Sequence, residues 1–563
     1  MRKTASRAGL HLRAIAGTHT VLLGFDMDNP AGCLGFAIRR IDHTESETYW
    51  LRGMKTFAST APHPAPGQDY STREHPIQGF QWGDYTAKPN HSYTYAVVAL
   101  GGTPEALVET RAVSLKVQTE KEDDGHHGVW FNRGVAGSQA YSKKFPNYLP
   151  PADESESNAA FTWLSRGLGE AFLSFCAQAT DSRWGLRGAF YEFTWDAGLA
   201  ALAAARDRGA DVRLVVHARD KDGDTGTDQT AAHSRAAAAA HQLDDGSTIT
   251  WRTAPSQSAL QHNKFLILTR NDFPVAVWTG SMNLTKGAVF GHSNVGHLIH
   301  DVYVAGDFLS YWNRLADNTA STPLMRAWDE KNNKRKEVVP AGDGITTVFS
   351  PRATTSTLLD WYAGLFDSAV ASAHITGAFG INKQIRAKLS ETRPGVTRTV
   401  LLDKDPPAGQ AIPHNDDHVR VSTGALLSNG FLEQWAAERL TGFNPLVRFI
   451  HTKIILIDPL GATPTILTGS ANYSDNSTTE NEENTVIIRC PTGNGASARQ
   501  ARRIADIYLT EYQRLFMHFV FRAWANTRPT APDMHLEPTD LWTQKYYRDG
   551  SWRADQRRLF AGT

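Results

Sequence analysis

The chain has 563 residues, and its 58 lysines and arginines equal its 58 aspartates and glutamates. This balance excludes a global basic field that favours nucleic acid or an anionic membrane, although local patches stay open. The length predicts more than one domain, and a 41% hydrophobic share is ample for buried cores. The cysteines, Cys33, Cys176 and Cys490, are odd in number and lack metal-like spacing, which fits reducing surroundings better than a disulfide framework.

The amino-terminal stretch MRKTASRAGLHLRAIAGTHTVLLGF has a basic start but no apolar stretch followed by a small-residue cleavage site. No segment approaches the roughly 18 apolar residues that a membrane span requires. We therefore expect a cytoplasmic protein without a transmembrane segment. Export by a machine that needs no signal peptide stays open.

Short, turn-punctuated segments fill residues 1–120, among them HTVLLGF, GCLGFAIRR and HSYTYAVVALGG. Such spacing without a long helical period predicts a small β-sandwich domain. The pairing of GFAIRR with AKPNHSYTYAVVAL resembles a fibronectin type III module. The charged run TEKEDDGHHG that follows predicts a solvated linker, which we favour over a metal site made by Asp123, Asp124, His126 and His127.

From residue 129 onward the pattern changes to alternating strands and helices. The series LRGAFYEFT, DAGLAALAAARDRG and DVRLVVHA predicts a βαβ unit, and SAHITGAFG, INKQIRAKLSE and VTRTVLLD repeat that order. We expect two α/β halves, 129–335 and 340–525, joined by a basic linker. The second half closes with a long amphipathic helix in RIADIYLTEYQRLFMHFVFRAWAN, and 526–563 is expected to be a tail packed on the body.

Each half contains the same polar motif at the start of an apolar run. His262 and Lys264 precede FLIL, and His451 and Lys453 precede IILI, with 18 positions from each histidine to the glycine of a later Gly-Ser-x-Asn. Because residues i and i+2 of a strand share a face, each His-Lys pair is expected to point together at a strand edge. The Gly-Ser-x-Asn turns add neutral donors that suit a phosphate: Ser281, Asn283, Ser470 and Asn472.

Two imidazoles and two ammonium groups define a chemistry that needs no metal or other cofactor. One imidazole is a competent nucleophile near neutral pH, and the other can protonate a leaving oxygen and later activate water. The lysines can hold nonbridging oxygens and offset charge that develops in the transition state. This inventory predicts a metal-independent phosphodiesterase that passes through a covalent phosphohistidine.

The paired motifs resemble the phospholipase D superfamily over roughly residues 129–525. The resemblance implies one catalytic body in a single chain, so that a monomer suffices, with both histidines facing across a pseudo-twofold axis. It also implies that His262 is the nucleophile. Our sequence-based fold class is thus α/β, with two pseudo-symmetric phospholipase D-like halves after a small β-sandwich.

The two copies differ at two positions. The second has Asp458, which the resemblance makes structural, and Glu483, which matches the family carboxylate that orients a catalytic imidazole. The first has Thr269 and Asn294 instead. One imidazole would therefore gain a charged partner and the other a neutral amide, so that their pKa values separate. The sequence leaves open whether Glu483 reaches His451 or crosses to His262.

His292, His297 and His300 resemble a zinc cluster, but their spacing does not place all three on one strand face. The departures at Thr269 and Asn294 leave open a catalytically silent module that binds phosphodiesters. For the substrate, we favour phospholipid headgroup hydrolysis over an endonuclease acting on DNA or RNA, because balanced charge supplies no long basic track.

Overall fold

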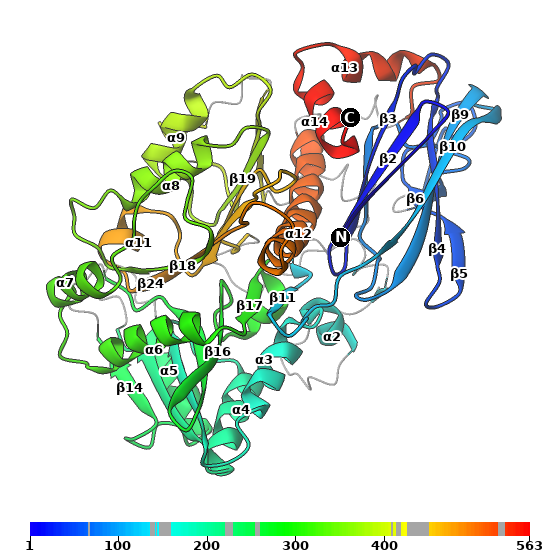
Figure 1. Ribbon diagram of the computed structural model, residues 1–563. Helices are drawn as coiled ribbons and strands as arrows, with labels where there is room; N and C mark the ends of the chain where they lie inside the picture. The colour runs from blue at the N-terminus through cyan, green and yellow to red at the C-terminus, as the bar shows by residue number, and fades with distance from the viewer. Residues whose placement is uncertain are drawn as a thin grey trace.

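The computed structural model describes residues 1–65, 68–134, 141, 144–145, 159–219, 229–253, 259–406, 409–412, 418–424, 450–526 and 535–563. Figure 1 shows two α/β units and an amino-terminal β-rich unit arranged around one long helix. Among the described residues, no helix is long and apolar enough to cross a bilayer. Cys33, Cys176 and Cys490 are buried free thiols.

The amino-terminal unit is a sandwich of two four-stranded antiparallel sheets, as predicted, because alternate apolar side chains of both sheets share one core. Phe25 and Phe36 meet across it with ring centroids 4.6 Å apart. The more specific resemblance to a fibronectin type III module stays a prediction. In sheet order the strands are β1 (Arg2–Arg7), β2 (Leu10–Ala16), β3 (Val21–Met27) and β8 (Gln81–Asp84), then β10 (Ala106–Gln118), β9 (Ser92–Thr103), β4 (Gly35–Asp42) and β5 (Glu47–Trp50), with a ribbon of β6 (Arg52–Gly53) and β7 (Tyr70–Ser71).

The predicted duplication is present as two seven-stranded sheets with the same strand order. In each sheet the last three strands are parallel and the remaining neighbours are antiparallel. The first sheet has the order β11 (His127–Phe131), β17 (Val295–Ile299), β16 (Phe273–Gly280), β15 (Lys264–Arg270), β12 (Trp184–Phe190), β13 (Asp211–His217) and β14 (Ile249–Arg252). The second has the order β18 (Gly344–Ser350), β24 (Glu483–Arg489), β23 (Thr465–Gly469), β22 (Ile454–Ile457), β19 (Ser372–Gly377), β20 (Thr397–Leu402) and β21 (Val419–Thr423).

Helices cover these sheets and begin and end where the sequence supplies signals. Asp301 caps α6 by accepting hydrogen bonds from the N–H groups of Tyr303 and Val304, and the chain leaves α4 through Gly209 at a φ of 92°. The first half has α2 (Ala159–Ser165), α3 (Leu168–Ala177), α4 (Asp196–Asp207), α5 (Thr230–Ala240), the π-helix η2 (Gly287–Gly291), α6 (Val302–Ala316) and α7 (Thr322–Asn332). The second has α8 (Leu358–Asp367), α9 (Lys383–Ser390), α11 (Asp475–Thr479) and α12 (Ala496–Asn526).

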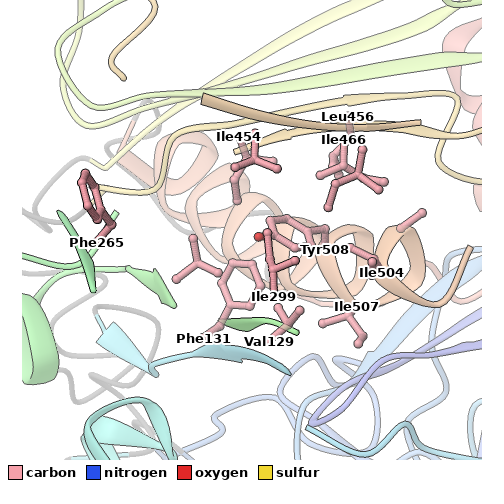
Figure 2. Close-up of a cluster of buried hydrophobic side chains, with 14 of the residues drawn as sticks. Val129, Phe131, Phe265, Ile299, Ile454, Leu456, Ile466, Ile504, Ile507 and Tyr508 are labelled. Atoms are coloured by element: carbon pink, nitrogen blue, oxygen red, sulfur yellow. The ribbon is translucent and has the colours of Figure 1, made fainter. Parts of the chain in front are cut away.

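Helix α12 lies in the centre of the molecule rather than on its surface. Figure 2 shows Ile504 and Tyr508 between apolar side chains of the first sheet, such as Ile299, and of the second, such as Ile454 and Ile466. The same core cluster includes Ile15 of the sandwich. The predicted long helix is therefore present, and three neighbours bury most of its described side chains from Ala501 onward.

The carboxy-terminal segment packs mainly on the amino-terminal sandwich. The indole Nε1 of Trp542 donates to the carbonyl of Cys33 (2.9 Å), and its ring stacks on Phe80 with centroids 5.3 Å apart. The backbone of Phe560 lies where a Cβ on Gly24 of β3 would stand, so helix α14 can approach strand β3 this closely only because that residue is glycine. The elements are η3 (Asp540–Thr543), α13 (Gln544–Tyr547) and α14 (Trp552–Ala561).

A buried ion pair joins the two α/β halves. Arg252 ends β14, and its Nε donates to Glu482 Oε2 at 2.7 Å, while its Nη atoms donate to the carbonyls of Leu315 and Ala320. The two side chains are 1% and 2% exposed. Glu482 immediately precedes β24, so this pair helps to set the position of one half against the other.

We expect Arg252→Met to lower the free energy of unfolding by about 3–5 kcal/mol, since it leaves the Glu482 carboxylate buried without its cation. The measurement is the thermal unfolding midpoint. Arg213→Met is the matched control, because that side chain is 60% exposed in its ion pair with Asp211 and surface pairs contribute about 0–1 kcal/mol. An unchanged midpoint in Arg252→Met would contradict the structural role of the pair.

Candidate active site

The histidines of the two motifs lie where the halves exchange backbone hydrogen bonds. The N–H of His262 donates to the carbonyl of Glu482 (2.9 Å), and the N–H of His451 donates to the carbonyl of Ser293 (3.2 Å). The prediction that each histidine opens a strand of its own sheet is corrected: β15 begins at Lys264 and β22 at Ile454. The preceding residues leave their sheet because their backbone pairs with the other half.

Each imidazole meets a side chain of the opposite half. His262 Nδ1 lies 3.1 Å from Glu483 Oε2, a close contact without hydrogen-bond geometry, since neither atom has a hydrogen-bond partner among the described residues. His451 Nδ1 is hydrogen-bonded to Asn294 Oδ1 at 2.9 Å. The question that the sequence left open is answered in this geometry, because Glu483 crosses to His262. The two contacts are related by the duplication, since Asn294 directly precedes β17 and Glu483, at the equivalent position of the second sheet, is the first residue of β24.

The amide of Asn294 is oriented by its surroundings. Its Nδ2 donates to the carbonyl of Ala288 (2.9 Å), so its Oδ1 is the atom that faces His451. Ser281 Oγ donates to the same Oδ1 at 2.8 Å. Around Glu483, Asn481 Nδ2 donates to Oε1 (3.0 Å), and Ser470 Oγ accepts from the N–H of the neighbouring Asn484 (3.0 Å). The hydroxyl of Ser281 thus bonds directly to a group that contacts a histidine, and that of Ser470 bonds to the residue next to the other such group.

Both lysines are buried, and each bonds to the carbonyl of its own motif histidine. Lys264 Nζ donates to His262 O and Lys453 Nζ to His451 O, each at 2.7 Å. Both side chains belong to residues that are 1% exposed. Burial lowers the pKa of Lys264 to about 7, and burial together with Lys264 holds the pKa of Lys453 well below its usual range.

The histidines and the carboxylate respond to the same desolvation. Burial, followed by the two lysine charges, holds the pKa values of His262 and His451 well below that of a free imidazole. Burial raises the pKa of Glu483 to about 8, although the nearby lysines oppose the shift. Both imidazoles therefore shift in the same direction, and their partners, a carboxyl and an amide, distinguish them.

The asparagines of the two turns lie differently. Asn283 Nδ2 donates to the carboxylate of Glu192, and its buried Oδ1 has no hydrogen-bond partner among the described residues. Asn472 Oδ1 is likewise buried and unpaired within the described part of the chain. An unpaired buried amide oxygen is costly, so both positions suit a ligand that brings donors.

Sequence reasoning missed two residues that support the histidine segments. His217 Nδ1 accepts from the N–H of Gln261 (3.3 Å), and Asp403 Oδ1 accepts from the N–H of Ile450 (3.0 Å). The strand pairings place His217 and Asp403 at equivalent positions of the two halves. A polar residue that directly follows the apolar run in both DVRLVVHA and VTRTVLLD was the available signal.

The environment of the two histidines is otherwise unequal. The Tyr191 ring lies 5.0 Å from that of His262, centroid to centroid, and 5.5 Å from Lys264 Nζ. Beside His451 lies a third imidazole, His292, at a centroid distance of 6.2 Å. Neither neighbour has a counterpart in the other half, since the strand pairings put Ala378 in the place of Tyr191 and Asn481 in the place of His292.

The remaining residues singled out in the sequence have contacts other than with His262 and His451. Both carboxylate oxygens of Asp458 accept hydrogen bonds from the N–H groups of residues 370–372, which hold the turn after β22. His297 contacts His127 (2.9 Å) and Tyr508, and His300 contacts Asp123 (3.1 Å). Among the described residues no three metal-ligating side chains converge, and the three histidines of the suggested zinc cluster have separate partners.

Comparison with known proteins identifies the family. A model described as "Cardiolipin synthase, PLD-like domain" matches residues 176–316 and again 365–506. Because the two matches together take in half of the chain, the protein belongs to this family, whose domain is of the phospholipase D-like phosphodiesterase type. No curated protein matches the sequence.

Several solved structures resemble the chain. Nuc, a phospholipase D family member from Salmonella typhimurium, is 30% identical over 27% of this chain and 87% of its own, with a TM-score of 0.21. Phosphatidylserine synthase from Haemophilus influenzae Rd KW20 is 12% identical over 70% of this chain and 93% of its own (TM-score 0.44). Polyphosphate kinase from Porphyromonas gingivalis is 12% identical over 62% of this chain (TM-score 0.35), and the match spans 48% of that protein.

Proposed function

We propose that the protein is a metal-independent phosphodiesterase that hydrolyses its substrate through a phosphohistidine. The observation that carries the proposal is the crossed pair of buried imidazoles, His262 held by Glu483 and His451 held by Asn294. In each pair Nδ1 faces the partner side chain, which leaves Nε2 for chemistry. Two buried lysines on the same segments supply positive charge without a metal ion.

The reaction divides into two displacements. In the first, Nε2 of His262 attacks phosphorus, the P–O bond to the leaving group breaks, and His451 gives that oxygen a proton. In the second, His451 takes a proton from water, the water oxygen bonds to phosphorus, and the P–N bond to His262 breaks. This assignment needs a neutral His262, which its low pKa favours because a neutral imidazole is nucleophilic. The pKa of His451 is lowered as well, so the negative charge of the bound substrate has to raise it before His451 donates its proton.

The other residues position these groups and bind the phosphate. Glu483 lies against Nδ1 of His262, where its charge would stabilise the imidazole as the N–P bond forms. Lys264 and Lys453 would hold the nonbridging oxygens, and entry of an anion raises their depressed pKa values. We assign Asn283 and Asn472 to the phosphate, and Ser281 and Ser470 to the support of Asn294 and Glu483.

We favour a phospholipid as the substrate because equivalent positions of the halves differ in polarity. The strand pairings put Glu192 of the first half in the place that Phe379 has in the second. Glu192 bonds to Asn283, whereas Phe379 is an exposed aromatic side chain. A diester with one polar and one apolar substituent matches such a pair: the headgroup lies toward Glu192 and the acyl chains toward Phe379.

Removal of either histidine should abolish turnover, with losses of at least about 10²–10⁴-fold for the acid/base alone. With an activated leaving group such as p-nitrophenol, which needs no proton, His451→Ala should still form the phosphohistidine but hydrolyse it slowly. Mass spectrometry should then find the adduct on His262. His43→Ala, an exposed histidine of the sandwich, is the control. Substantial turnover by either active-site variant in EDTA would refute the mechanism.

The pH profile tests the role of Asn294. Asn294→Asp puts a carboxylate beside Nδ1 of His451, which favours the imidazolium and raises its pKa by about 1–3 units. Because the protonated form donates to the leaving group, the alkaline limb of kcat/KM should move to higher pH. Asn318→Asp, an exposed change, should leave the profile in place. An unmoved alkaline limb in Asn294→Asp would remove His451 from the role of acid.

The substrate class is tested with mixed phospholipid vesicles, single- and double-stranded DNA, and RNA, all in EDTA. We expect headgroup release from the vesicles by wild type and none by His262→Ala. Phe379→Ser should raise KM for vesicles and leave kcat for a soluble p-nitrophenyl diester unchanged. Cleavage of nucleic acid only would make the protein an endonuclease, and binding of diesters without turnover would make it a silent module.

A further inference from the structure

A cavity lies apart from the histidine motifs, where the sandwich, the second half and the carboxy-terminal segment meet. Its volume is about 410 Å³, which falls within the usual range for small-molecule sites. Gln81 of β8, Arg420 of β21 and Trp552 of α14 are among its lining residues, and α12 contributes apolar side chains. In the second sheet β21 is the edge strand, separated from β22 of the active site by β19 and β20.

The charges around this cavity are of one sign. Its described lining residues include Lys55, Arg420, Lys545, Arg553 and Arg557, and none of the described lining residues is acidic. Asp26 pairs with Arg557 from outside the lining. Burial, followed by the charge of Arg553, lowers the pKa of Arg420 to about 10 and also lowers that of Lys545. The cations therefore oppose one another, and an anion in the cavity would relieve that repulsion.

The same cavity has an aromatic wall. The guanidinium carbons of Arg420 and Arg553 lie 3.9 and 4.4 Å from the ring centroid of Trp552. Tyr546 belongs to the same lining. Indole and guanidinium planes both stack on planar rings. Gln81 adds a buried Nε2 donor that has no partner within the described part of the chain.

We propose that this cavity binds a nucleoside polyphosphate. The phosphates would lie among Lys545, Arg553 and Arg420, and the base would stack on the layer that Trp552 forms with the two guanidinium groups. The lining matches both the phosphates and the base of such a ligand. Clustered cations alone would bind any polyanion, and the aromatic wall favours a polyanion that also carries a planar ring. The site is separate from the histidine motifs and does not depend on their catalytic role.

Isothermal titration calorimetry of the full chain in EDTA tests the site, with ATP, tripolyphosphate and adenosine as probes. We expect ATP to bind at one site, tripolyphosphate more weakly and adenosine not at all. Lys545→Gln and Arg553→Gln should each lower the affinity for ATP and for tripolyphosphate by about tenfold or more, since each removes a charge-assisted contact. Trp552→Leu should lower the affinity for ATP about fivefold or more and leave the affinity for tripolyphosphate unchanged, since it removes only stacking.

Two controls separate this site from the active site and from general charge. Arg183→Gln removes an exposed arginine that pairs with Asp181 and should leave ATP binding unchanged, as should Lys453→Ala. The proposal fails if Lys453→Ala loses ATP while Arg553→Gln retains it, or if millimolar ATP does not bind to wild type. It also fails if an oligonucleotide binds through these residues and ATP does not. Unfolding midpoints of every variant exclude misfolding as the cause.

Discussion

The active site depends on hydrogen bonds that cross between the halves. Gln261 pairs with Glu482 and Ser293 pairs with Ile450 as parallel bridges, so each histidine segment is fixed by the other half as well as by its own, which contributes His217 and Asp403. The crossed imidazole contacts follow from this pairing, because Asn294 and Glu483 lie next to the bridging residues. Neither half contains both an imidazole and the group that orients it, so the site exists only when the halves are docked.

That docking accounts for the unusual burial of charge. Two lysines, two histidines and Glu483 share a region from which water is largely excluded, and each charged form is disfavoured there. The lysine ammonium groups are held by carbonyls of their own histidine segments rather than by carboxylates. The region is therefore short of negative charge, and a phosphodiester supplies it in the place where displacement would occur.

The sequence was sufficient to predict the duplicated α/β fold and the sandwich, because periodicity and repeated motifs report on structure within each half. It was not sufficient for the relation between halves. The register of Asn294 and Glu483 can be read from the chain, but whether each faces its own histidine or the opposite one is set by packing. Glu192 escaped notice because a single carboxylate in a loop has no pattern. The central position of α12 escaped notice because an amphipathic period does not say which neighbours cover the helix.

The unequal partners are the feature that a symmetric duplication would lack. In the proposed mechanism a carboxylate beside the Nδ1 of His262 would stabilise positive charge on that ring as its Nε2 bonds to phosphorus. The imidazole that protonates the leaving group must instead lose its proton easily, so strong stabilisation of its positive charge would hinder it. An amide at Nδ1 of His451 would orient that ring without stabilising its charge. The substitution of Asn294 for a carboxylate is thus compatible with a division of labour between two histidines that began as copies.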